Sequence, residues 1–259
     1  MSPDTGEVHL TDDGDVWWLE LSNPGRHNAL TWRMYDRLEE ICAATHAAPG
    51  LRVLVVRGGG GSFAAGTDIA QFTEFTGADG LAYERRMDEV LRSLLAVRVP
   101  VVGVVEGPAV GAGLAIAACC DVLLASEDAR FGVPVARTLG NMVATVAMHR
   151  LRIRLGAART TAMFLTARLL RAADAATAGF VHTVCAPEDL EHSVGALVER
   201  LRSNAPLTLA AAKEIERRLD GLDTLPAHED VLARCYGSDD FQEGVAAFLD
   251  RRIPEWKGR

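Results

Sequence analysis

The stretch Glu106-Gly-Pro-Ala-Val-Gly-Ala-Gly-Leu-Ala-Ile-Ala-Ala-Cys-Cys-Asp121 decides how this 259-residue chain folds. It follows the β-branched run of residues 101–105, which is typical of a fully buried strand. Residues 111–120 carry no charge, and a helix that is apolar all round lies inside a protein. The first amides of such a helix lack internal acceptors and lie at the positive end of its dipole. Strand, glycine turn and helix together predict a site for an anion or a developing oxyanion.

Two other interpretations apply to the same glycines. A phosphate-binding loop is disfavoured, because no Gly-x-x-x-x-Gly-Lys-Ser/Thr is present and Gly111-x-Gly113 lacks the third glycine of a dinucleotide fingerprint. The other interpretation is structural: the glycines only let another segment pack closely against the helix.

A second glycine-rich stretch separates these interpretations. Residues 53–57 are another apolar, strand-like run, and Gly58-Gly-Gly-Gly61 and Phe63-Ala-Ala-Gly-Thr-Asp-Ile69 follow it. Together the two stretches resemble the crotonase (enoyl-CoA hydratase/isomerase) superfamily. The resemblance continues in order through Ala129-Arg-Phe-Gly-Val-Pro134, Leu165-Thr-Ala-Arg168 and Glu243-Gly-Val-Ala-Ala-Phe248.

This resemblance implies an α/β fold: a crotonase-type spiral of ββα units with a C-terminal helical trimerisation region. We expect residues 1–195 to form the spiral core with an acyl-CoA site. Residues 196–259 are then the helical region for subunit contacts, in a homotrimer or a dimer of trimers. The family binds an acyl-CoA thioester with its carbonyl oxygen between two backbone N–H groups, which in this sequence belong to Thr67 and Ala112. CoA is part of the substrate, so no separate cofactor and no metal is expected.

The resemblance also implies which residues line the substrate site. Arg26 and His27 are candidate CoA contacts, although an exposed loop cation and a partly packed His explain them equally well. Asp68 is expected mainly to order its turn rather than to act as a base. The expected substrate-binding set is Arg26, His27, Ala64, Ala65, Asp68, Ile69, Ala70, Gly111, Ala115 and Val135.

The sequence departs from the family at its two catalytic glutamates, whose positions here are Ala115 and Val135. Neither side chain can move a proton. The loop of residues 134–142 offers three other candidates. Arg137 is suited to holding a substrate carboxylate or an enolate bidentately, or else to a salt bridge with another subunit. Thr138 and Asn141 are candidates to position water, although capping of a helix over residues 142–155 is favoured for Asn141.

We therefore predict an acyl-CoA enzyme of the enoyl-CoA hydratase/isomerase family that stabilises a thioester enolate. One alternative is an acyl-CoA decarboxylase or a C–C or thioester hydrolase that uses Arg137 with Thr138 or Asn141. Another is a non-catalytic acyl-CoA-binding protein, which the loss of both glutamates favours and the intact glycine-rich loops disfavour.

The composition indicates which classes of partner and which cellular location are expected. The formal net charge of −8 argues against nucleic acid as a partner, and no apolar run approaches the length of a membrane span. The five cysteines include no Cys-x-x-Cys, which favours reduced thiols in a cytoplasmic protein.

Local patterns predict a helix capped by Thr31 and a helix over residues 79–97. In the second helix, Leu91, Leu94 and Leu95 are expected to face inward and Glu84, Arg85, Arg86 and Asp88 to be exposed.

Overall fold

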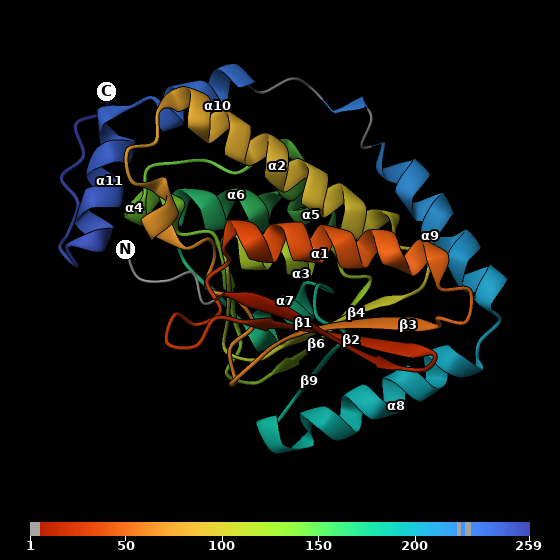
Figure 1. Cartoon of the computed structure of the whole chain (residues 1–259). Coiled ribbons are helices and arrows are strands. Elements are labelled where there is room, and N and C mark those ends of the chain that lie inside the picture. The colour runs from red at the N-terminus through yellow and green to blue at the C-terminus, as the bar shows by residue number, and fades with distance from the viewer. Residues whose placement is uncertain (1–5, 222–223, 226–228) are drawn as a thin grey trace.

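The computed structural model describes residues 6–221, 224–225 and 229–259 (Figure 1). Within these ranges, a six-stranded sheet has the strand order β1-β2-β3-β4-β6-β9, and a three-stranded sheet has the order β5-β7-β8. Neighbouring strands are parallel except in the pairs β1–β2 and β7–β8. The strands are β1 Glu7–Asp13, β2 Val16–Ser22, β3 Val53–Gly58, β4 Val101–Val105, β5 Pro108–Val110, β6 Val122–Ser126, β7 Arg130–Gly132, β8 Leu170–Arg171 and β9 Thr183–Cys185.

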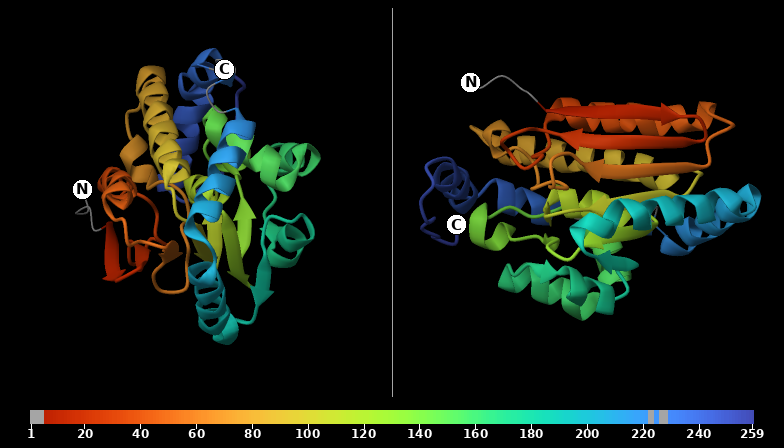
Figure 2. Two further views of the ribbon diagram at one scale, coloured as in Figure 1. Left: turned by 90° about the vertical axis from the view of Figure 1, so that its right-hand side faces the viewer. Right: turned by 90° about the horizontal axis from the view of Figure 1, so that it is seen from below.

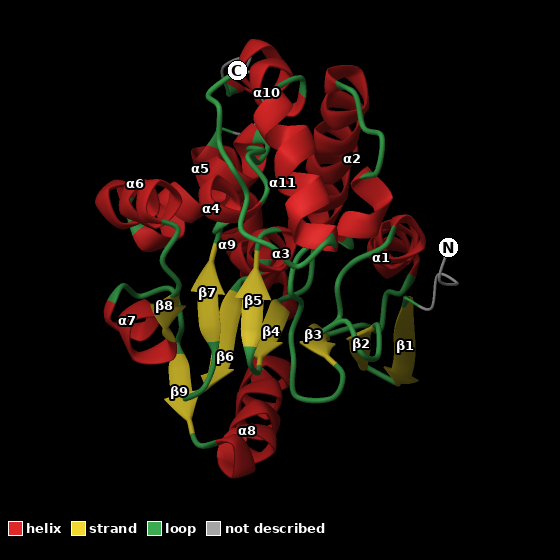
Figure 3. Ribbon diagram, turned by 90° about the vertical axis from the view of Figure 1, so that its left-hand side faces the viewer, coloured by secondary structure: helices red, strands yellow, loops and turns green. Residues whose placement is uncertain are grey.

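Helices cover both faces of the larger sheet. Helices α1 and α2 lie on one side and α8 on the other, and α9 and α11 lie at opposite ends of the molecule (Figures 1, 2 and 3). The helices are α1 Trp32–Ala44, α2 Gly77–Ala96, α3 Ala112–Cys119, α4 Val135–Thr138, α5 Thr145–Leu155, α6 Ala157–Thr166, α7 Ala172–Thr177, α8 Leu190–Ser203, α9 Pro206–Asp220, α10 Glu229–Tyr236 and α11 Asp239–Leu249, with short 3₁₀ turns η1 Thr45–Ala47, η2 Ile69–Phe72 and η3 Pro187–Asp189.

The central strands are apolar on both faces because both faces are covered. In β3, Leu54 and Val56 belong to the main core under α1, α2 and α3, whereas Val53 and Val55 pack with residues of α8 on the opposite face. Alternate residues of a strand point to opposite faces, so a strand buried on both sides reads as a continuous apolar run. The predicted buried strands 53–57 and 101–105 are confirmed.

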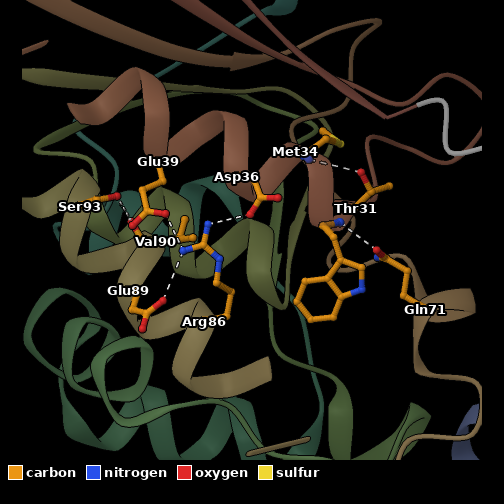
Figure 4. Close-up of polar contacts among 10 residues, drawn as sticks. Thr31, Met34, Asp36, Glu39, Gln71, Arg86, Glu89, Val90 and Ser93 are labelled. Atoms are coloured by element: carbon orange, nitrogen blue, oxygen red, sulfur yellow. Dashed lines mark hydrogen bonds and ion pairs between the residues drawn. The ribbon is translucent and has the colours of Figure 1, made fainter. Parts of the chain in front are cut away.

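A side chain caps α1 at its N-terminus, and ion pairs join α1 to α2. The Thr31 hydroxyl accepts the Met34 N–H and caps α1, as predicted. On α2, the Arg86 guanidinium reaches Asp36 and Glu39 of α1 and also Glu89 one turn further along α2 (Figure 4). This arrangement fixes how α2 is placed over the sheet.

The C-terminal helices pack against α2 through an aromatic cluster. At Gly80 of α2, a Cβ would lie 2.0 Å from Cγ of Tyr236 in α10, so only glycine allows this approach. Tyr236 contacts Phe241 of α11 edge to face, with ring centroids 4.8 Å apart. The ring centroids of Phe241 and Phe72 of η2 are 6.1 Å apart. The end of the chain is thereby held against the loop that follows β3.

Several sequence predictions differ from the structure. Strand β1 was not predicted, and it forms an antiparallel hairpin with β2. The helix predicted over residues 142–155 begins only at Thr145. Residue 195, the predicted boundary, lies within α8, and the division into two regions stays a prediction. Residues 1–5 of the predicted core and residues 222–223 and 226–228 of the predicted C-terminal helical region lie outside the described residues. No helix in the described ranges combines the length and apolarity of a membrane span.

Candidate active site

The first loop of the site follows β3 and directs the Thr67 N–H away from Leu30, its bridge partner. A parallel bridge pairs Leu30 with Thr67: the Leu30 N–H donates to the Gly66 carbonyl at 2.7 Å, and the Asp68 N–H donates to the Leu30 carbonyl at 2.9 Å. In such a bridge the bonds go to the residues on either side of Thr67. The N–H of Thr67 itself therefore points to the other side.

The second loop follows β4 and leads into the buried helix α3. Gly111 has a φ of 54°, in the region that favours glycine, and its N–H donates to the Gly132 carbonyl at 2.9 Å. Ala112 is the first residue of α3, so the helix offers its N–H no acceptor. The buried, apolar helix predicted from the sequence is confirmed.

The two loops contact each other through their backbones. A Cβ on Gly113 would lie 2.2 Å from the Ala64 carbonyl oxygen, and the nearest atom to a Cβ on Gly111 would be Gly66 Cα, at 3.7 Å. The glycines thus allow the close approach that brings Thr67 and Ala112 to one cavity of about 560 Å³. Within the described residues, the amides of Thr67 and Ala112 have no hydrogen-bond acceptor.

The Thr67 side chain anchors the first loop to the helices above it. Its hydroxyl lies 2.6 Å from the Tyr35 hydroxyl of α1 and 2.6 Å from the Tyr83 hydroxyl of α2. Burial raises the pKa of both tyrosines well above the ordinary value, so both stay neutral hydroxyl groups. The sequence analysis did not identify either tyrosine.

The open end of the cavity carries the predicted CoA contacts. Arg26 forms an ion pair with Asp68, and Asp68 also accepts the Ala70 N–H at 3.2 Å and caps η2. This geometry matches the expected turn-ordering role of Asp68. His27 is exposed, with a φ of 47°, and the buried Asn28 donates to the Gly59 carbonyl at 2.9 Å.

The cavity wall also contains a buried carboxyl group. Glu84 of α2 is 3% exposed, so the prediction that it is exposed is wrong. Its carboxyl accepts the Ala144 N–H at 2.7 Å and the Tyr236 hydroxyl of α10. Burial raises the pKa of Glu84 to about 8 from an ordinary 4.5, and these two hydrogen bonds lower it. The spacing of Glu84, Met87 and Leu91 already places all three on one helix face, which is the signal that sequence analysis missed.

Asn141 belongs to this wall and does not cap the helix that follows it. Its Nδ2 donates to the Tyr236 hydroxyl at 3.0 Å, and the residue that caps α5 is Ala144, without a side-chain bond. The prediction that Asn141 is an N-cap is therefore wrong. Thr138 lies at the end of α4, where its hydroxyl donates to the Pro134 carbonyl at 3.1 Å.

Most predicted site residues line this one cavity. Arg137 and Ala64 are the exceptions: Arg137 is exposed on α4, and Ala64 is buried behind the loop. The predicted residues that line the cavity are Arg26, His27, Ala65, Thr67, Asp68, Ile69, Ala70, Gly111, Ala112, Ala115, Val135, Thr138 and Asn141. Lining residues that were not predicted include Tyr83, Glu84, Met87, Leu91, Ala144, Ala147, Phe248, Leu249 and Arg251. In the described residues, no group of three or more His, Cys, Asp or Glu side chains is placed to hold a metal ion.

The chain is similar over nearly its whole length to several known proteins. The 2,3-dehydroadipyl-CoA hydratase of Escherichia coli is 32% identical, over 98% of this chain and 99% of that protein. The carnitinyl-CoA dehydratase of Proteus mirabilis is 30% identical, over 97% of this chain and 98% of that protein. A structure of methylmalonyl-CoA decarboxylase in complex with 2-nitronate-propionyl-CoA superposes with a TM-score of 0.87 at 26% identity, over 97% of this chain and 98% of that chain.

The match to the family itself is equally broad. The family model for enoyl-CoA hydratase/isomerase matches residues 12–259, which extends from β1 to the end of the chain. The predicted crotonase-type α/β fold is confirmed, and so is the family that the sequence resembles. The chain belongs to the crotonase (enoyl-CoA hydratase/isomerase) superfamily of acyl-CoA enzymes.

Proposed function

We propose that this protein binds an acyl-CoA thioester and stabilises its enolate between the N–H groups of Thr67 and Ala112. The observation that carries the proposal is that these two amides face one cavity and have no acceptor among the described residues. Two N–H groups without a protein acceptor in the wall of one cavity indicate a ligand oxygen that accepts from both. The dipole of α3 adds positive potential at Ala112.

The size and lining of the cavity fit the acyl part of such a substrate. A volume of about 560 Å³ lies in the range of small-molecule sites, roughly 300–1,000 Å³. Ala115, Met87 and Leu91 give it apolar walls, and the partly exposed Arg26, which is paired with Asp68, supplies a positive charge for a CoA phosphate. CoA enters as part of the substrate, and no further cofactor is required.

Among enolate reactions, decarboxylation of a malonyl-type CoA is the second, more specific candidate. Ala115 and Val135 replace the two carboxylates with which family hydratases hold water, so addition of water lacks its usual groups. Loss of carbon dioxide generates an enolate without a base, because the bond that breaks leaves its electron pair on the α-carbon. The similarity to methylmalonyl-CoA decarboxylase supports this candidate. Cleavage of a C–C or thioester bond by water is the remaining alternative.

Two substrates distinguish these reactions. The purified protein is incubated separately with methylmalonyl-CoA and with crotonyl-CoA, and the products are followed by mass spectrometry. We expect loss of carbon dioxide from methylmalonyl-CoA and little gain of water by crotonyl-CoA. The Thr67→Pro variant lacks one donor, so its turnover should fall on the order of 100-fold. Undiminished turnover in Thr67→Pro would contradict the placement of the enolate, and CoA binding without any reaction would favour a non-catalytic binder.

We also propose that the C-terminal helical region mediates self-association into a trimer or a dimer of trimers. Helix α9 has no buried residue, and it exposes Leu207, Ile215 and Leu219. Exposed apolar patches of this kind mark interaction surfaces. Sedimentation equilibrium of the full chain measures the mass of the assembly directly, and a monomer at micromolar concentration would contradict this proposal.

A further inference from the structure

Glu84 is a carboxyl group in the cavity wall that the oxyanion hole does not use. Asp68 and Glu84 are the carboxyl groups among the residues that line the cavity, and Asp68 is paired with Arg26. Glu84 is almost completely buried and bonds to two neutral donors, the Tyr236 hydroxyl and the Ala144 N–H. Burying a charge with neutral partners alone is costly, so this environment favours the protonated acid.

Glu84 is connected to the oxyanion hole through its neighbour in the sequence, Tyr83. Tyr83, the neighbour of Glu84 in α2, bonds through its hydroxyl to the Thr67 hydroxyl at 2.6 Å. The same turn of α2 therefore holds the first oxyanion loop and carries the carboxyl group. Ala115 and Met87 also line this cavity, and Ala115 stands where the family has one of its glutamates.

We propose that Glu84 exchanges a proton with the α-carbon of the thioester held at Thr67 and Ala112. This inference rests on the enolate function proposed above and replaces the acid–base groups missing at Ala115 and Val135. In decarboxylation, the bond from the α-carbon to the carboxylate breaks, carbon dioxide leaves, and the electron pair passes into the enolate. The α-carbon then bonds to the Glu84 proton, and the resulting carboxylate regains a proton from water.

The groups that face Glu84 suit both of its protonation states. The Tyr236 hydroxyl and the Ala144 N–H donate to the carboxylate that remains after proton transfer, so its charge is not left unsolvated. Burial raises the pKa of Tyr236 well above its ordinary value, so Tyr236 stays a neutral donor. The negative charge of Asp88, one turn further along α2, raises the pKa of Glu84 and adds to the effect of burial. A carboxyl that titrates near working pH is suited to general acid–base catalysis.

Proton exchange on a saturated thioester tests this role apart from decarboxylation. Propionyl-CoA is incubated in D₂O, and α-deuterium uptake is followed by mass spectrometry for the wild type and for Glu84→Gln. Glutamine keeps the shape of the side chain and, like the protonated acid, has one accepting oxygen and one donating group, but it carries no transferable proton. We expect exchange to fall on the order of 100-fold or more, while the Kd for propionyl-CoA changes less than about threefold. Glu89→Gln on the exposed face of the same helix should exchange like the wild type.

The pH profile separates a catalytic Glu84 from a merely structural one. Exchange requires the carboxylate as base, so the wild-type rate should rise through about pH 8 as the proton leaves Glu84. Tyr236→Phe removes a hydrogen bond that lowers the pKa of Glu84, so the midpoint should move to higher pH. A midpoint that does not move in Tyr236→Phe would contradict the proposal even if Glu84→Gln failed to fold.

Failure of this inference is distinguishable from failure of the proposed function. If the wild type exchanges deuterium and Glu84→Gln exchanges within about threefold of it, enolate formation stands and the assignment of Glu84 is overturned. If the wild type binds propionyl-CoA and takes up no deuterium, both the enolate function and the role of Glu84 are overturned.

Discussion

The cavity has two walls that are built in opposite ways. One wall is backbone: the amides of Thr67 and Ala112, presented by two glycine-rich loops that touch each other. The other wall is a side-chain network in which Glu84, Tyr236 and Asn141 come from α2, α10 and the segment before α5. In the first, each donor needs only the right chain path through its own glycine-rich loop, and the two loops then meet through backbone contacts. The second needs three distant parts of the sequence to meet.

This difference determines which substitutions each wall tolerates. A backbone donor survives most changes of side chain, because the N–H remains as long as the loop keeps its path. A buried side-chain network depends on the identity and packing of every member, since one missing partner leaves a buried polar group unsatisfied. The backbone wall should therefore fail when an amide is removed or when the path of its loops is disturbed, and the side-chain wall should respond to pH and to changes of volume.

The largest expected effect comes from removing an amide. Ala112→Pro deletes the donor at the first position of α3, where proline suits the helix backbone. Losing one oxyanion donor costs about 3–4 kcal/mol of transition-state stabilisation, so α-deuterium exchange on propionyl-CoA should fall about 10²–10³-fold.

Ala157→Pro is the matched control for this variant. Ala157 is the first residue of α6 and also follows a glycine of positive φ, Gly156, but it lies outside the cavity. Its exchange rate should equal that of the wild type. Equal rates in Ala112→Pro and Ala157→Pro would mean that the α3 amide is not part of the oxyanion hole.

The two walls also differ in how far the sequence predicts them. The backbone wall follows from local signals: a β-branched strand, a glycine turn and an apolar helix around Ala112, and the family motif around Thr67. The contact between Glu84 and Tyr236 spans 152 residues, and no local pattern specifies it. The spacing of α2 places Glu84 on its apolar face, yet a run of four charged residues among positions 84–88 indicates a solvated face. In the structure, packing against α10 buries Glu84, as the spacing of the apolar face predicts and the run of charges does not.

Asn141 shows the same limit on a smaller scale. Asparagine before an apolar helical run predicts an N-cap. The helix instead begins three residues later than predicted, at Thr145 rather than at position 142, and the Asn141 amide is free to reach Tyr236. Arg137 is exposed on α4 and does not line the cavity, so its contact with a substrate carboxylate stays a prediction.

The second expected effect is a pH dependence of stability that belongs to the side-chain wall alone. The pKa of Glu84 is about 8 in the folded protein against an ordinary value of 4.5, so between these values the folded state holds a proton that the unfolded state releases. The contribution of Glu84 to the free energy of unfolding is therefore fully present below pH 4.5 and is lost as the pH rises through 8. The loss amounts to up to about 1.4 kcal/mol per pH unit.

Urea unfolding of the wild type and of Glu84→Gln from pH 5 to 9 isolates this contribution, because the other titrating groups cancel in the difference. We expect the variant to gain stability relative to the wild type as the pH rises toward 8 and the difference to level off above it. A difference that does not vary with pH would show that the folded protein holds Glu84 as a carboxylate throughout.

The smallest expected effect tests how α10 packs on α2. Gly80→Ala places a Cβ 2.0 Å from Cγ of Tyr236, so the ring must move and the bond from Tyr236 to Glu84 must lengthen or break. Overpacking of this kind costs about 1–3 kcal/mol. The free energy of unfolding measured in urea should therefore fall, while the backbone wall keeps its affinity for CoA.

Gly195→Ala makes the same substitution where no atom lies within 4 Å of the new Cβ, on the exposed face of α8. With nothing to clash, alanine should raise the stability by roughly 0.5–1 kcal/mol, because glycine is unfavourable inside a helix. The sign of the effect should thus differ between two identical substitutions in two helices. If Gly80→Ala also stabilised the protein, Tyr236 could not lie against α2, and the side-chain wall would lose the residue that links Glu84 to Asn141.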